Sequence, residues 1–210
     1  MKSHQNSIHA ILAATSALAF ASPAHAATIA LNNASFEAPA MGGWAWGTAP
    51  SSWTYNYGPL GLAPTGHTGS QSVWNYVNSG WFQISQNSSY TVGQAGEVLT
   101  AGVYVAISNL DSGQSTVNLK LLLDGVTAVQ TQPAYYANQT WTLLTTQYTT
   151  VAADIGKTVG MAFGGDGGWG ASGGSYTYFD DASLTTSIPE PGTALLGGLG
   201  MLSLLRRRRA

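Results

Sequence analysis

The chain has no cysteine, and its central part carries very little positive charge. Without thiols it forms no disulfides, so stability has to come from a packed core or from a bound metal. Between residues 27 and 188 there is no arginine, and Lys120 and Lys157 stand against eight carboxylates, a formal charge of −6 compared with −2 for the whole chain. An acidic surface without a basic patch argues against nucleic acid as a partner.

Long hydrophobic runs are also missing, and the first of two short ones lies at the N-terminus. Lys2 precedes an uncharged apolar stretch from Ile11 to Phe20, and the small-residue sequence Ala24-His25-Ala26 follows. Ten residues are too few to span a membrane, and the run has no polar face that would suit a first helix of the domain. The pattern predicts a signal helix over residues 1–26, removed by signal peptidase after Ala26.

The second short run lies at the C-terminus, between a proline-rich turn and a basic end. Pro189, Glu190 and Pro191 precede an uncharged stretch at 192–205, and four arginines follow. The prolines stop the preceding strand, and 14 helical residues cover about 20 Å of a hydrocarbon core of about 30 Å. This predicts a weakly held hydrophobic helix in the inner membrane, with the cytoplasmic arginines as its stop, namely Arg206, Arg207, Arg208 and Arg209.

Turn, short span and arginine cluster in this order resemble the PEP-CTERM sorting signal of Gram-negative bacteria, here at residues 188–210. The resemblance implies that an exosortase cuts near the Pro-Glu-Pro turn and passes the protein to the cell surface or the extracellular matrix. The logic is that of a removable anchor, so the mature protein has no membrane span. The alternative is a small tail anchor that is retained.

The segment between the two ends is predicted to consist of strands, with no convincing helix. Alternating and β-branched residues predict strands at 28–31, 71–77, 81–86, 98–108, 116–123, 126–132, 140–150, 157–163 and 176–185. Asp124-Gly125 predicts a type I′ hairpin, and residues 39–70 are expected to form a long loop. Strands at hairpin spacing without crossover helices predict one all-β domain at residues 27–187, an antiparallel β-sandwich of the jelly-roll type.

Two motifs at the ends of this domain resemble those of carbohydrate-binding modules of families 4, 9 and 22. Asn32 to Glu37 reads NNASFE and Tyr178 to Leu184 reads YFDDASL, with Ala182 where the family usually has valine. The resemblance implies a galactose-binding-like sandwich whose first and last strands lie side by side. It also implies a structural calcium held by Glu37 and by Asp180 or Asp181, with carbonyl oxygens from residues 65–70.

Elementary chemistry supports a metal at this place as well. Strand alternation puts Asp180 on the same face as Ala182 and Leu184, so Asp180 is expected to point inward. A buried carboxylate needs a cation or a proton, and the domain has few side-chain cations. Ca²⁺ suits oxygen ligands better than zinc, which prefers thiolates and imidazoles. Alternatively, Asp180 and Asp181 are solvated residues at a strand end.

Aromatic residues are concentrated in the expected loops, where they are candidates for binding a ligand. Flat rings with a polar edge suit the C–H face of a sugar, which predicts an uncharged glycan as ligand. The alternatives are that Trp74, Trp81 and Trp141 pack within strands and that the loop rings cap the sandwich. The candidate binding residues are Trp44, Trp46, Trp53, Tyr55, Tyr57 and Trp169.

The sequence contains no recognisable catalytic motif. Glu37 and Glu97 are isolated from each other, and His67 lies in GHTGS, which is not a nucleophile elbow. The sequence therefore predicts a non-enzymatic, exported protein that binds an extracellular polysaccharide. A structural matrix protein without a glycan ligand is the alternative, and adhesion to ice or other surfaces is less favoured because no regular Thr-x-Thr array recurs.

Overall fold

The computed structural model describes residues 26–58, 60–76, 82–107, 114–131, 134–136, 140–166 and 176–188. Residues Ala26–Ser187 form one compact unit. The predicted signal helix, apart from Ala26, and the predicted hydrophobic helix at 192–205 lie outside the described residues. Within the described part of the chain, no helix is long and apolar enough to span a bilayer.

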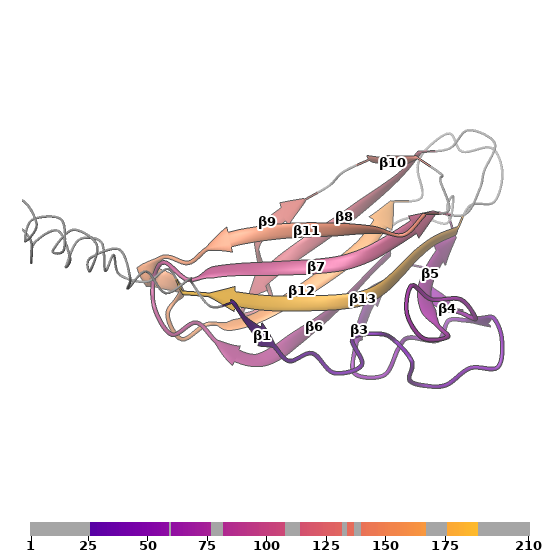
Figure 1. Ribbon diagram of the computed structural model, residues 1–210, viewed down its shortest axis with the longest axis horizontal. Helices are drawn as coiled ribbons and strands as arrows, with labels where there is room; N and C mark the ends of the chain where they lie inside the picture. Colours follow the sequence, from indigo (N-terminus) through magenta and orange to yellow (C-terminus); the bar gives the residue numbers. More distant parts are fainter. Residues whose placement is uncertain are drawn as a thin grey trace, which may run out of the picture. The chain divides into compact units, whose positions relative to one another are not determined.

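The described residues build two antiparallel sheets that pack face to face as a β-sandwich (Figure 1). Sheet A has the order β11 (Thr142–Thr149), β7 (Val98–Ile107), β13 (Tyr176–Ser187), β5 (Ser72–Tyr76), β4 (Gly61–Ala63) and β2 (Ala45–Trp46), with β1 (Ala26–Ile29) also beside β13. Sheet B has the order β10 (Ala134–Tyr136), β8 (Gln114–Leu123), β12 (Thr158–Asp166), β6 (Phe82–Thr91) and β3 (Thr54–Tyr57), with β9 (Val126–Thr131) beside β8. This confirms the all-β antiparallel prediction.

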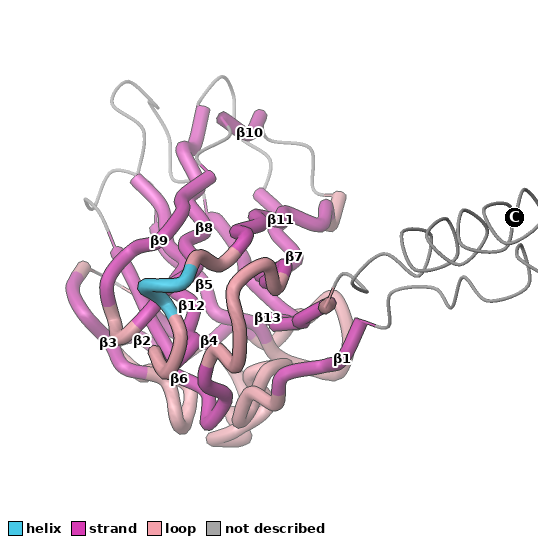
Figure 2. Tube along the Cα trace, turned by 90° about the vertical axis from the view of Figure 1, so that its left-hand side faces the viewer, coloured by secondary structure: helices cyan, strands magenta, loops and turns pink. Residues whose placement is uncertain are grey.

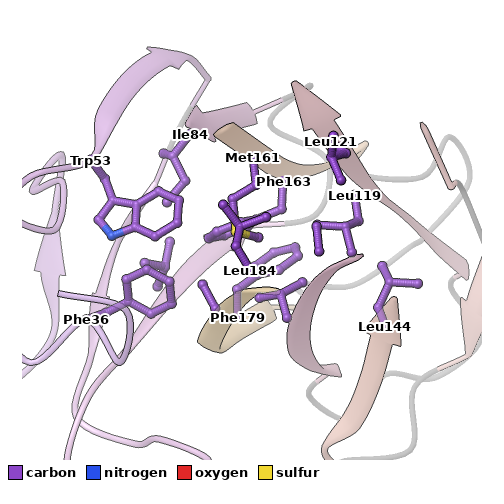
Figure 3. Close-up of a cluster of buried hydrophobic side chains, with 14 of the residues drawn as sticks. Phe36, Trp53, Ile84, Leu119, Leu121, Leu144, Met161, Phe163, Phe179 and Leu184 are labelled. Carbon is purple, nitrogen blue, oxygen red and sulfur yellow. The ribbon is translucent and has the colours of Figure 1, made fainter. Parts of the chain in front are cut away.

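The core lies between the sheets and follows from strand alternation. In β8, the side chains of Val117, Leu119, Leu121 and Leu123 all point into it and are buried. Figure 3 shows Leu119 and Leu121 facing Phe163 and Phe179, whose rings stack with centroids 5.0 Å apart. The hairpin after β8 has positive φ at Asp124 and Gly125, as a type I′ turn requires.

The longest strand, β13, connects the first part of the domain to the rest. Its first half pairs with β5, and its last residues pair with β1, where Ile29 lies opposite Leu184. On the other side, β13 pairs with β7. Figure 1 shows β5 near one end of β13 and β1 near the other. The first and last strands of the domain therefore lie side by side, as expected.

The expected long loop at residues 39–70 contains regular structure that the sequence pattern did not predict. Strands β2, β3 and β4 lie in this stretch, and each has two to four residues. One 3₁₀ turn, η1 (Ala152–Asp154), is the helical element of the described residues and is drawn in cyan in Figure 2. Strands this short have too few residues to show an alternating pattern.

Candidate functional site: an aromatic strip and a carboxylate-held loop

A continuous row of aromatic rings crosses the outer face of sheet A. We call it the aromatic strip. In β13, Phe179 points into the core, so Tyr178 and Tyr176 point outward. In β5, Val73 points inward and the neighbouring Trp74 outward. The strip consists of Trp44, Trp46, Trp74, Tyr76, Trp141, Tyr176 and Tyr178.

The rings of the strip contact one another from strand to strand. Trp46 meets Trp74 edge-on, with centroids 4.4 Å apart and planes at 89°. Trp74 lies 5.3 Å from Tyr176, and Trp44 lies 5.4 Å from the same ring. These separations are typical of favourable aromatic pairs. The strip is therefore a packed surface, held in place before any ligand arrives.

Trp44 and Trp46 form the exposed part of the strip, and Trp74 forms its base. The exposed fractions are 51% for Trp44 and 63% for Trp46, whereas Trp74 is fully buried. Close packing at this point needs Gly61, because a Cβ there would lie 2.7 Å from Nε1 of Trp74 and 1.9 Å from the carbonyl oxygen of Ala45. Two large indole surfaces are thus presented to solvent above a buried third.

A small pocket opens beside Trp46. Its volume is about 220 Å³, and it is lined by Trp46, Gly47, Ala49, Tyr55, Gly58 and Leu60. Tyr55 is 49% exposed, and its hydroxyl donates to the carbonyl oxygen of Gly58. The volume is below the range of about 300–1,000 Å³ typical of pockets for drug-sized ligands, so the pocket suits one ring rather than a whole ligand.

Beside the strip, three carboxylates hold the loop at residues 66–71. One oxygen of Asp180 accepts the backbone N–H groups of His67 and Thr68, at 2.7 and 3.2 Å. Asp181 accepts from Nδ1 of His67 and from the hydroxyl of Thr68, both at 2.7 Å. Glu37 accepts the backbone N–H groups of Ser70 and Gln71, at 2.9 and 3.0 Å. The first and last motifs of the domain therefore meet at one loop.

Asp180 is buried because the loop covers it. A bulge between Asp180 and Ser183 interrupts the alternation, and Asp181 adopts a positive φ of 47°. Phe179, Ala182 and Leu184 consequently share the core face, whereas Asp180 lies on the outer side of sheet A under the loop. The prediction that Asp180 points inward with Ala182 and Leu184 was wrong, although its carboxylate is fully buried.

The loop environment shifts the pKa values of Asp180 and Glu37 in opposite directions. Burial raises the pKa of Asp180 to about 7, and the negative charge of Asp181 adds to this, against the lowering effect of backbone N–H donors. Burial also raises the pKa of Glu37, but hydrogen bonds from the Ser70 hydroxyl and from the amides of Gln71 and Ser70 outweigh it and leave that pKa below its ordinary value.

His67 joins the loop to the aromatic strip. Its ring stacks on Tyr104, with centroids 3.7 Å apart and planes at 14°, and lies 5.8 Å from the ring of Trp141. Because Asp181 holds Nδ1 of His67, the imidazole has a fixed orientation. The carboxylates thus position a histidine at the end of the strip, a role that the sequence did not indicate.

The candidate ligand residues fall into three groups. Trp44, Trp46 and Tyr55 are exposed, as expected of binding residues. The prediction of Trp53 as a binding residue was wrong, because its side chain is 6% exposed and packs in the core against Phe36 (Figure 3), with ring centroids 5.2 Å apart. Tyr57 belongs to β3, but its side chain is not described, and Trp169, like Trp81, lies outside the described residues.

Sequence reasoning missed five of the seven rings of the strip. The missed rings, which were either treated as packing residues or not selected, are Trp74, Tyr76, Trp141, Tyr176 and Tyr178. Trp74 and Tyr76 in β5, and Tyr176 and Tyr178 in β13, have an i, i+2 spacing, which puts both rings of each pair on one face. That spacing was a usable indication, but strand pairing between β5 and β13 was needed to bring the two pairs together.

The predicted metal residues are neighbours, yet they do not form a metal-binding group among the described residues. In the described ranges, no three histidine, cysteine, aspartate or glutamate side chains are arranged to hold an ion. N–H and O–H donors of the loop face Glu37, Asp180 and Asp181 in the place where carbonyl ligands were expected. The calcium ion therefore stays a prediction.

The fold defines the chain as a β-sandwich of a kind found in carbohydrate-binding modules and in cyclases. A cyclase from Fischerella sp. TAU is 16% identical, with a TM-score of 0.64 over 79% of this chain and 100% of that chain. The carbohydrate-binding module TmCBM61, in complex with β-1,4-galactotriose, is 17% identical, with a TM-score of 0.51 over 75% and 98%. At these identities the likeness shows the fold alone.

The match at the C-terminal end of the chain is more specific than the likeness in fold. Residues 187–209 match the PEP-CTERM protein-sorting motif, as predicted, and the motif implies export and transient anchoring in a membrane. No curated protein matches the chain. The chain is therefore a β-sandwich protein that carries a PEP-CTERM sorting motif.

Proposed function

We propose that the mature domain binds an uncharged polysaccharide through the aromatic strip, without catalysing a reaction on it. The observation that carries the proposal is the unbroken row of ring contacts across sheet A, from Trp46 through Trp74 and Tyr176 to Tyr178. The accessible rings of this row are those of Trp44 and Trp46 and the half-buried Tyr176 and Tyr178, and they offer stacking positions to sugar units of one chain, while the buried Trp74 supports them. The acidic charge of the domain disfavours anionic polymers and suits a neutral one.

The absence of catalysis is proposed from how the carboxylates are used. Hydrolysis of a glycoside requires two carboxyl groups free to face the scissile bond. Here the oxygens of Glu37, Asp180 and Asp181 accept hydrogen bonds from the loop at residues 66–71. The carboxylates beside the strip thus serve to shape the surface. A reducing-sugar assay on every polysaccharide that binds should detect no release.

Affinity electrophoresis of the domain at residues 27–188 through gels containing neutral polysaccharides tests the binding proposal. The double variant Trp44→Ala, Trp46→Ala should bind roughly 5- to 150-fold more weakly than the wild type, because two aromatic contacts of about 0.5–1.5 kcal/mol each are lost. Val126→Ala is the matched control, since Val126 is 70% exposed but lies outside the strip. Its affinity should be unchanged.

Failure of this proposal has a recognisable outcome. If no polysaccharide retards the wild-type domain and soluble glycans leave its tryptophan emission unchanged, the aromatic strip does not bind glycans. The protein is then better described as a structural matrix protein whose rings only pack. Equal weakening by Val126→Ala would also contradict a role of the strip.

We also propose that Ca²⁺ stabilises the carboxylate-held loop, with Glu37, Asp180 and Asp181 as ligands. Support comes from three carboxylates gathered around one loop in a domain with two lysines. Calcium at about 100 times its Kd should add about 2.7 kcal/mol and raise Tm by about 5–11 °C over a sample in chelator. Glu37→Gln should reduce this shift and Asp124→Asn should retain it, while an identical wild-type Tm with and without chelator counts against the site.

The sorting motif completes the proposed role. We infer that an exosortase processes the tail near Pro189, Glu190 and Pro191 and that the domain is then displayed on the cell surface or in the extracellular matrix of a Gram-negative bacterium. Polysaccharide binding at that place would attach the protein to the matrix without a permanent membrane span.

A further inference from the structure

Exposed aliphatic side chains are concentrated at one end of the sandwich. The exposed fractions are 70% for Val126, 53% for Val151 and 53% for Ile155. We call these three residues the aliphatic end. Among the described residues of the domain, Leu143 is the remaining large aliphatic side chain that is exposed.

Strand register shows that the three residues of the aliphatic end lie at the same end of the sandwich as the last residue of β13. Val151 and Ile155 lie between the last residue of β11, Thr149, and the first of β12, Thr158. Val126 follows the β8–β9 hairpin, whose Asp124 N–H donates to the carbonyl oxygen of Thr158 at 2.9 Å. Ser187, the last residue of β13, pairs with Val98 of β7, and Val98 in turn pairs with Thr149. Figure 1 shows these strand ends together, with β4 and β5 at the other end.

The charged groups of this end are held by partners within the domain. Asp154 accepts from Nζ of Lys157 at 2.9 Å and from the hydroxyl of Tyr148 at 2.8 Å. The backbone N–H of Val151 and the Lys157 side chain hold the pKa of Asp154 at about 2. Glu97 is 1% exposed and accepts from the hydroxyl of Tyr90. The surface therefore shows aliphatic groups beside the buried Asp154 and Glu97 and beside Asp124, whose exposed carboxylate accepts the N–H of Thr158 at 2.8 Å.

The chain leaves the domain at this end, and the predicted hydrophobic helix follows immediately. Three residues separate Ile188 from the start of the uncharged stretch at 192–205. Four residue steps span at most about 14 Å. While the tail is inserted, the chain therefore holds this end of the domain within about 14 Å of the bilayer surface. The strip begins at the opposite end of β13, roughly 35 Å away for a strand of this length.

We propose that the aliphatic end rests on the lipid surface while the precursor is anchored, with Val126, Val151 and Ile155 contacting the headgroup region. Aliphatic side chains of this size gain from leaving water, and the tether supplies the high local concentration that so small a patch needs. This contact orients the domain with its aromatic strip away from the membrane. The proposal depends on the tail and is independent of the glycan proposal.

The absence of cysteine makes a direct test possible with the full chain. Val126→Cys, Val151→Cys and Ile155→Cys variants are labelled with a polarity-sensitive dye and reconstituted into vesicles of phosphatidylethanolamine and phosphatidylglycerol. Gly42→Cys is the matched control, because Gly42 lies near the strip and a Cβ there meets no atom within 4 Å. Emission of the three labels should shift to shorter wavelengths with vesicles, and a lipid-phase spin label should quench it, whereas the Gly42 label should show neither effect.

Two outcomes would overturn the proposal. In the first, the protein floats with the vesicles but the labels at positions 126, 151 and 155 behave like the label at position 42. In the second, the full chain does not float with the vesicles, so that no tether holds the domain at the bilayer. Flotation is therefore measured for every labelled variant alongside its emission spectrum.

Discussion

Trp53→Ala is expected to lower the free energy of unfolding of the domain by about 3–5 kcal/mol, the usual cost of removing a large aromatic side chain from a core. The ring of Trp53 packs 5.2 Å from Phe36 and 5.3 Å from Phe163, and its exposed fraction is 6%. Its indole N–H also donates to the carbonyl oxygen of Asn33 at 3.1 Å, which ties the first loop to the core.

Urea unfolding of the domain at residues 27–188 measures this loss, and Trp44→Ala is the matched control. Trp44 belongs to the same stretch of sequence but is 51% exposed, so its replacement should cost about 1 kcal/mol or less. In the gel assay the order should be reversed, with Trp44→Ala weakening glycan binding and the less drastic Trp53→Phe leaving it intact. Equal losses of stability for the two alanine variants would contradict the separation of core and surface tryptophans.

Raising the pH from 5 to 8 in the presence of chelator should lower the free energy of unfolding by about 2–3 kcal/mol through Asp180. Its pKa is about 7 in the folded domain against 3.8 as a free side chain. Between these values the folded state binds more protons than the unfolded state. The contribution of Asp180 to the free energy of unfolding is therefore fully present below about pH 4, falls as the pH rises towards 7 and levels off above pH 7. The pKa values of Glu37 and Asp154 are lowered in the folded domain, so these two groups stabilise it when ionised. Their contributions are lost only at more acidic pH, below the range of this experiment.

Chemical unfolding at a series of pH values, with Asp180→Asn beside the wild type, tests this linkage. The variant cannot ionise at position 180, so its stability should change little between pH 5 and 8, whatever its absolute value. Asp124 is an exposed carboxylate at the other end of the domain, so Asp124→Asn should keep the wild-type slope. A flat wild-type profile would show that Asp180 is already ionised at pH 5. If the profile measured with calcium is flat and only the profile measured in chelator has a slope, the cation predicted at this loop is what keeps the carboxylate charged.

Much of the fold could be predicted because the features that specify it are local. Alternation in residues 116–123 predicted β8 and its buried face, and Asp124-Gly125 predicted the hairpin that follows. The PEP-CTERM motif was likewise predicted because its three parts are consecutive in the chain. By contrast, β2 and β4 were missed, since strands of two or three residues exist only because neighbouring strands offer them hydrogen bonds.

The candidate site was predicted less well, because residue type alone does not decide burial. Trp44, Trp46 and Trp53 lie within ten residues of one another in a stretch rich in glycine and small residues, and the sequence treated them alike. A bulge after Asp180 also reversed the expected facing of the following residues. One extra residue in a strand turns every later side chain to the other face, and the sequence carries no local mark of it.

The sequence by itself determined the PEP-CTERM motif and the antiparallel β class, since the first depends on residues that are neighbours in the chain and the second on a repeated alternation. That the first and last strands of the domain lie side by side followed from the resemblance to carbohydrate-binding modules. Only the tertiary structure decided that Trp53 belongs to the core, that three carboxylates fasten one loop, and that rings from positions 44 to 178 form one strip. The physical reason is that burial and ring contacts depend on which strands become neighbours, and strand order in a sandwich is set by the packing of the whole domain.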